Sequence, residues 1–153
     1  MASFRVNGVE GLDLTYERKA QLSDDDLLRI IRAGAEVMRE RLREKAALEK
    51  VSRALKEDLA DSFKLFERKE SGNPFILVSP AGKHRPNGRG IRERKSDPKR
   101  KGKTNAAVAF VLEYGSPRHN ATHFMEECVE ASTPEVIAAM EAEFSKLMDE
   151  RGL

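Results

Sequence analysis

The chain has 153 residues, of which 39% are hydrophobic and 35% charged, a size and composition typical of one polar globular domain. Its longest apolar run covers residues 106–112, far short of the roughly 20 residues that a membrane-spanning helix needs. The N-terminal sequence MASFRVNGVEG lacks the apolar centre of a signal peptide. A single cysteine excludes a disulfide scaffold within the chain and fits a reducing compartment.

The net charge of +2 conceals a local excess of cations. Residues 83–103 hold ten Lys and Arg residues against two acids, so this segment carries +8 and the remaining chain −6. It contains one large aliphatic residue, Ile91, and cannot bury enough apolar surface to offset its ordering entropy. We expect a flexible basic loop at about 83–104 that contacts either phosphates, without base specificity, or acidic protein surfaces during assembly. Its cations are Lys83, Arg85, Arg89, Arg92, Arg94, Lys95, Lys99, Arg100, Lys101 and Lys103.

The first strong element in chain order is a helix that begins after Ser23, preceded by a possible short strand at residues 4–6. The Ser23 hydroxyl is a suitable N-cap, and the three aspartates that follow suit the positive end of the helix dipole. Because Gly34 lowers helix stability, we expect another element to approach closely there. The apolar stripe of this helix comprises Leu27, Ile31, Gly34, Ala35, Met38 and Leu42.

A hairpin is predicted after a second helical stretch. Residues 46–62 have helical propensity, with a break expected between 46 and 50. From Phe63 the apolar residues alternate, residues 71–74 form a strong turn signal, and residues 75–78 read as the returning strand.

The apolar run at residues 106–112 suits a buried strand or a strand entering a helical turn, and periodicity alone does not separate them. Residues 113–117 break the pattern, and Gly115 adopts positive φ without steric cost. Beyond the break, Phe124 and Cys128 share one helical face. We therefore interpret this stretch as an apolar strand that turns sharply into a short amphipathic helix. For Tyr114 we expect a buried ring with a hydrogen-bonded hydroxyl, and a subunit contact is the alternative.

Residues 133–135 predict the start of a separate C-terminal helix, with Thr133 as cap and Pro134 in the first turn. The resulting fold class is α+β: a small antiparallel sheet of three to four strands packed against a long N-terminal helix and a C-terminal helix. Residues 1–153 form one domain. The apolar stripe of the C-terminal helix comprises Ile137, Met140, Phe144 and Leu147.

No catalytic constellation is apparent. Three residues are possible metal ligands, which would suggest a metal site or a metal-dependent nuclease: His119, His123 and Cys128. A closed zinc site needs four ligands, however, and no supporting motif is present. Acidic neighbours disfavour a Cys128 thiolate, and its helical spacing from Phe124 favours a small core residue. We therefore expect no enzyme, no metal and no cofactor.

Two sets of residues carry a resemblance to a known family. The downstream set consists of Phe110, Val111, Glu113, Tyr114, Gly115, Ser116, Phe124 and Met125. The upstream set is Leu59 and Ser62, spaced as Leu-x-x-Ser. In this order they resemble the minor tail and tail-completion proteins of long-tailed phages, the group named after the tenth gene product of a lambda-like phage. The chain departs from the family at His119 and His123, where prolines are common, and at residues 56–58, where Thr-Gly is usual.

The resemblance implies a structural virion protein that acts in tail completion or head–tail joining, as a ring at the neck. Its expected partners are copies of itself, other neck and tail proteins and, without sequence specificity, packaged DNA; no membrane or small-molecule substrate is expected. Its expected location is the virion, and the host cytoplasm during assembly. The alternative is a small cellular nucleic-acid-binding protein that uses the basic loop.

Overall fold

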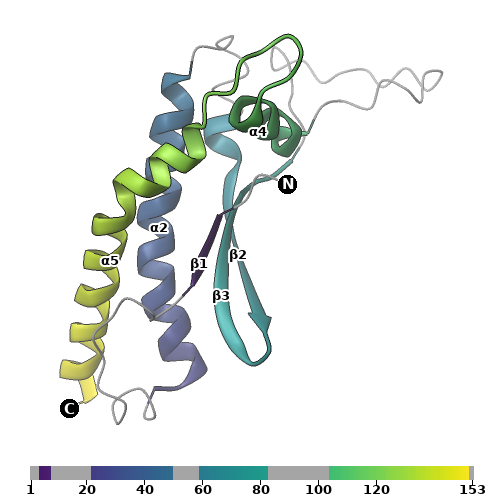
Figure 1. Ribbon diagram of the computed structural model, residues 1–153. Coiled ribbons are helices and arrows are strands. Elements are labelled where there is room, and N and C mark those ends of the chain that lie inside the picture. Colours follow the sequence, from purple (N-terminus) through teal and green to yellow (C-terminus); the bar gives the residue numbers. More distant parts are fainter. Residues whose placement is uncertain (1–3, 8–21, 50–58, 83–103, 152–153) are drawn as a thin grey trace.

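The computed structural model describes residues 4–7, 22–49, 59–82 and 104–151 (Figure 1). Its elements in chain order are β1 (Phe4–Asn7), α2 (Asp24–Leu48), β2 (Phe63–Glu70), β3 (Asn73–Pro80), α4 (Asn105–Tyr114) and α5 (Phe124–Arg151). The two long helices lie side by side and run in opposite directions, and the sheet packs on α2 (Figure 1). The α+β class, the antiparallel sheet and the long N-terminal and C-terminal helices are thus confirmed.

Helix α2 begins as predicted. The Ser23 side chain accepts a hydrogen bond from the Asp26 backbone N–H, and the Asp26 side chain accepts one from the Ser23 backbone, which is a capping box. The helix ends at Leu48, inside the predicted break, because Glu49 is extended with ψ 143°. The continuation of helical structure through residues 50–58 lies outside the described residues, and residues 59–62 are helical again.

The seam between α2 and α5 is the centre of the core. Ile30, Ile31, Ala35, Met38 and Leu42 on α2 are fully buried, and Cys128, Val136, Met140 and Leu147 on α5 are also buried. The close approach expected at Gly34 is confirmed. A Cβ atom there would lie 2.7 Å from Met140 Cγ and 3.0 Å from Val136 Cγ1, both on α5. Arginine side chains of α2 pair with glutamates of α5 across the exposed rims of this seam.

The predicted hairpin is confirmed, but its turn is shorter than the predicted residues 71–74, because Asn73 and Pro74 already pair as part of β3. Its two-residue turn, Ser71 and Gly72, has φ values of 51° and 86°, the left-handed pair that a type I′ turn requires. In the antiparallel register Leu65 lies opposite Val78, and Phe66 lies opposite Leu77. Strand β1 pairs with the other edge of β3, so the order in the described part of the chain is β1-β3-β2.

Residues 106–112 are helical, so the prediction of an apolar strand is wrong. The Thr104 hydroxyl accepts a hydrogen bond from the Ala107 backbone N–H and thereby caps the helix α4. Ala109 and Leu112, three positions apart, are buried, whereas Phe110 between them is 46% exposed. The run therefore forms a helix with one buried face, and its alanines favour the helical conformation. An apolar run of this length does not distinguish a strand from a helix by itself.

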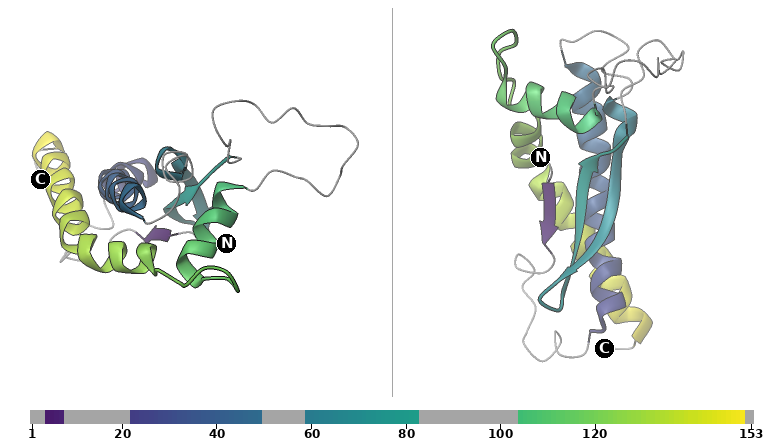
Figure 2. Two further views of the ribbon diagram at one scale, coloured as in Figure 1. Left: turned by 90° about the horizontal axis from the view of Figure 1, so that it is seen from above. Right: turned by 90° about the vertical axis from the view of Figure 1, so that its right-hand side faces the viewer.

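The two separate helices predicted on either side of residue 132 are one continuous helix, α5, so this prediction is also wrong. Cys128, Ser132, Val136 and Met140 are all buried, a four-residue spacing that continues past Pro134 and keeps one face on α2. Pro134 is exposed, and the Thr133 hydroxyl donates to the Val129 carbonyl at 2.7 Å. The helix bends along its length (Figure 2, left), as expected for a helix with an internal proline. In the C-terminal half the core residues are Met140, Leu147 and Met148, whereas Ile137 and Phe144 are only half-buried.

Candidate interface at the corner between α4 and α5

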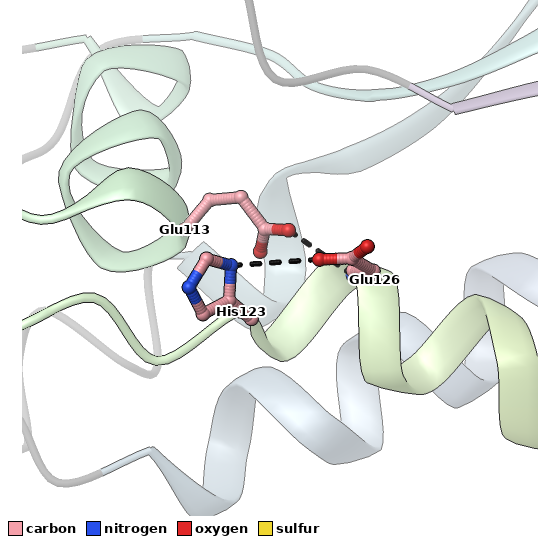
Figure 3. Close-up of side chains that lie close together, drawn as sticks. All are labelled: Glu113, His123 and Glu126. Atoms are coloured by element: carbon pink, nitrogen blue, oxygen red, sulfur yellow. Dashed lines mark hydrogen bonds and ion pairs between the residues drawn. The ribbon is translucent and has the colours of Figure 1, made fainter.

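The corner between α4 and α5 contains most of the residues that carry the family resemblance. Glu113, near the end of α4, is only 5% exposed. Its Oε2 accepts a hydrogen bond from the Met125 N–H at 2.8 Å. Its Oε1 accepts one from the Glu126 N–H at 3.2 Å, which Figure 3 shows. The first N–H groups of a helix have no partner inside the helix, and a carboxylate is favoured at its positive end. Glu113 is therefore a cap for α5 that comes from another element.

Gly115 ends α4 with a φ of 80°. A Cβ atom at this position would lie 2.9 Å from the Ala121 nitrogen and 3.0 Å from the His119 carbonyl oxygen, both backbone atoms. Only glycine fits both the φ angle and this space. Ser116 and His119 close the turn that follows, through backbone hydrogen bonds of 2.8 and 3.1 Å.

The next residues hold the corner against α4. The Leu112 carbonyl accepts hydrogen bonds from both the N–H and the hydroxyl of Thr122, at 2.7 and 3.0 Å. Phe124 is fully buried and Met125 nearly so, which places both in the core. Val111 is half-buried. In this motif, therefore, Glu113, Gly115, Phe124 and Met125 stabilise the corner.

The upstream pair, Leu59 and Ser62, is part of the same scaffold. Leu59 is fully buried, and the Ser62 hydroxyl donates to its carbonyl at 2.7 Å. The Ser62 carbonyl accepts from Ala81 N–H at 2.8 Å, and the Ala81 carbonyl accepts from Asn105 Nδ2 at 2.9 Å. The Asn105 N–H also donates to the Gly82 carbonyl at 3.0 Å.

These bonds hold together the two residues that flank the basic segment, Gly82 and Thr104, at the start of α4. The ten cations of the segment lie outside the described residues, so the structure does not test their predicted contacts. Asn105 was not among the predicted site residues. The sequence contains one indication of its role, because Asn105 is a single amide residue placed directly before the apolar run at residues 106–112.

Phe110 and Tyr114 form an exposed aromatic pair on α4. Their ring centroids are 4.9 Å apart, and the side chains are 46% and 59% exposed. The prediction of a buried Tyr114 ring is wrong, because residues four apart share a helix face and this face is opposite the buried Ala109 and Leu112. Leu48 is the other large hydrophobic residue among the described residues that is exposed. The motif thus combines buried structural residues with two exposed aromatic rings.

One cluster of possible metal ligands lies at the same corner. In the described part of the chain, Glu113, His123 and Glu126 place one ligand atom each within 4.8 Å of one another (Figure 3). His123 Nδ1 lies 3.5 Å from Glu126 Oε2. Both Glu113 oxygens already accept hydrogen bonds from the first turn of α5, whose positive dipole opposes a cation. His119 and Cys128, the other predicted candidates, do not belong to this cluster.

Cys128 is a core residue, as predicted. It is buried on α5, with Sγ 3.8 Å from Ser132 Oγ. Burial raises the pKa of the Cys128 thiol, so that the protonated form dominates at neutral pH. This environment disfavours a nucleophilic thiolate.

Comparison with known proteins gave no match to a family model, to a curated protein or to a solved structure. None of the helices in the described residues is long and apolar enough to cross a membrane.

Proposed function

We propose that this chain is a structural virion protein of a phage or prophage that acts in tail completion or head–tail joining. Copies of the chain form a closed ring at the neck, and the ring joins the end of the tail to neck proteins. The protein works by geometry, without catalysis, metal or cofactor. It resides in the virion tail or neck and, during assembly, in the host cytoplasm.

The observation that carries this proposal is that the corner motif contains two kinds of residue: buried residues that stabilise the corner, and exposed aromatic residues that do not. Glu113 and Gly115 are needed to build the corner, because one caps α5 and the other fits where a Cβ does not. Phe110 and Tyr114 have no such internal role and are exposed. Aromatic residues are enriched in the centres of protein–protein interfaces, so this motif fits a subunit contact on a rigid scaffold.

The basic segment supports a position near packaged DNA. The residues that flank this segment, Gly82 and Thr104, are held at the start of α4, where Asn105 bonds to the Gly82 and Ala81 carbonyls. Cations at this density bind phosphates without base specificity, and the binding weakens steeply with salt. Contacts of this kind are compatible with a ring around packaged DNA, but the proposal does not depend on them.

Deletion of the gene in its phage tests the proposal. We expect full heads and tails that remain separate in electron micrographs, and joined particles after the gene is supplied in trans. Normal joined particles from the deletion strain would contradict the proposal.

The second candidate is a cellular nucleic-acid-binding protein, which the +8 charge of residues 83–103 favours. It predicts that the free protein binds duplex DNA or RNA and that the affinity falls steeply with salt. A titration of labelled duplex at two salt concentrations separates the candidates, because tail completion requires no such affinity of the free protein.

A further inference from the structure

Strand β1 joins the sheet along one edge of β3 (Figure 2, right). Its four residues pair in antiparallel register with the four residues of β3 from Phe75 to Val78. Strand β2, on the other edge, pairs with all eight residues of β3. The other main contact of β1 within the described part of the chain is with α2. The attachment of β1 is therefore short and consists mainly of its pairing with β3.

The edge of β3 that β1 occupies is suited to a short strand. Pro74 and Pro80, on either side of the paired residues, have no backbone N–H to donate to a neighbouring strand. The hydrogen bonds of a strand pair are formed by backbone groups and do not depend on which chain supplies the strand. Residues Phe4–Asn7 of a second copy therefore fit this edge as well as those of the same chain.

The end of β1 and the start of α2 lie at the same end of the sheet. Asn7 lies opposite Phe75 of β3. The neighbouring Pro74 lies opposite Lys69 of β2, and Lys69 forms an ion pair with Asp24 in the first turn of α2. Two strand spacings and one ion pair thus separate Asn7 from Asp24, a distance of at most about 20 Å.

The connection from β1 to α2 is longer than this distance requires. Sixteen residues, 8–23, connect Asn7 to Asp24. A connection of this length spans up to about 55 Å when fully extended. A compact domain of this size is roughly 40 Å across, so the same edge of an adjacent copy lies within reach. Residues 8–21 lie outside the described part of the chain, and this upper bound depends only on their number.

We infer that in the assembled ring β1 of each copy leaves its own β3 and pairs with β3 of the next copy. This inference rests on the proposed ring and names a contact that links its subunits. The strand that is donated and the edge that accepts it are different parts of the chain. The contact is therefore head-to-tail and repeats around the ring.

The exchange replaces each lost strand pair by an identical one. Its net cost in hydrogen bonding is consequently small, as in other exchanges of an element between copies. In the free protein, the chain's own strand competes at an effective concentration on the order of millimolar, so the closed form dominates in dilute solution. A ring holds neighbouring copies at a comparable effective concentration, and the exchange can occur. Each copy then donates one strand and accepts another, so it leaves the ring only when both strands are released.

Oxidation of a paired-cysteine variant tests the inference. Arg5 lies opposite Leu77, and directly opposite residues of antiparallel strands have Cα atoms about 4.5–5.5 Å apart, within the range of a disulfide. The variant Arg5→Cys with Leu77→Cys is supplied in trans to a phage that lacks the gene. The purified particles and the free purified protein are each treated with a mild oxidant and run on a denaturing gel without reductant. We expect linked chains from the particles, and single chains with an internal disulfide from the free protein.

Two controls show whether the disulfide reports the pairing of β1 with β3. The variant Arg5→Cys with Lys64→Cys places the second thiol on β2, which does not pair with β1, and we expect no linked chains from it. Chains with Arg5→Cys alone and chains with Leu77→Cys alone, supplied together, should give linked pairs in particles and nothing larger. This mixture has only one substitution in each chain, and the native Cys128 is buried.

Particles that contain the protein with disulfides only inside single chains would overturn the inference and leave the proposed function intact. Linked chains in equal yield from the Lys64→Cys control would also overturn the inference, because the disulfides would then not depend on the register of β1 with β3. Absence of the parent protein from intact particles would refute the proposed function, and the inference with it.

Discussion

The carboxylate of Glu113 caps the helix that begins eleven residues later, with Oε2 2.8 Å from the N–H of Met125. This hydrogen bond connects α4 to α5 and fixes the angle of the corner. We predict that Glu113→Ala destabilises the protein by about 1–2 kcal/mol, the cost of losing a helix cap at a buried position. Glu113→Gln, which keeps one acceptor oxygen, costs less. Thermal or urea unfolding measures both, and Glu126→Gln is the exposed control that we expect to change stability little.

Gly115→Ala tests whether the corner requires a residue without a side chain at the end of α4. The new Cβ meets two backbone atoms within about 3 Å and sits at positive φ, so we expect a loss of about 2–3 kcal/mol. Gly72→Ala is the matched control, because Gly72 also has positive φ but has nothing within 4 Å of its added Cβ. It should cost only about 1 kcal/mol. Equal losses for both variants in urea unfolding would show that the contacts at Gly115 are not needed.

Gly34→Ala tests the close approach of α2 and α5. Alanine favours a helix over glycine by about 1 kcal/mol, but the Cβ overlaps Met140 Cγ at 2.7 Å. We expect the overlap to dominate, so that the variant is less stable than the parent. In a double-mutant cycle, Met140→Ala should make Gly34→Ala favourable. Additive effects of the two substitutions would contradict this packing.

The pH dependence of stability follows from Arg29, which donates hydrogen bonds to Glu143 and Glu150 on α5. These hydrogen bonds hold the pKa of both carboxyl groups below their ordinary values. A carboxyl group whose pKa is lowered by folding stabilises the folded state above its unfolded pKa, and this contribution disappears as the pH falls through the lowered value. We predict that Arg29→Gln is less stable than the parent at pH 7 and that the difference narrows toward about pH 3. Urea unfolding across this range measures it, and a difference that stays constant would be inconsistent with the linkage.

Phe110→Ser and Tyr114→Ser separate assembly from folding. Because both side chains are exposed, we expect a change in unfolding free energy of less than about 1 kcal/mol for either variant. In a phage complementation assay, both variants should fail to restore joined particles. Unfolding of either variant at ordinary temperature would instead assign the aromatic pair a structural role.

The sequence predicted the elements whose signals are local. Ser23 with its aspartates marks a helix start, residues 71–74 mark a turn between two strands, and Gly34 in an apolar stripe marks a close approach. Each depends on neighbours within a few residues, and each is confirmed.

The incorrect predictions depend on tertiary structure. Residues 106–112 are apolar enough for either a strand or a helix, and the choice follows from the Thr104 cap and from packing of one face. Pro134 resembles a helix start, but the α2 surface favours one continuous helix on both sides of it. The cap of α5 by Glu113 connects residues 12 and 13 positions apart, which no local pattern reports. The ring of Tyr114, predicted to be buried beside the glycine corner, is exposed because it lies on the face of α4 opposite the buried Ala109 and Leu112.

The most direct test of the central claim is quantitative mass spectrometry of purified phage particles from the source, scaled against the major tail protein. We predict that the protein is present at a few to about a dozen copies per particle, as a single closed ring requires. Its complete absence from intact particles, while the major tail protein is detected at full abundance, would contradict the claim that it is a structural component of the neck.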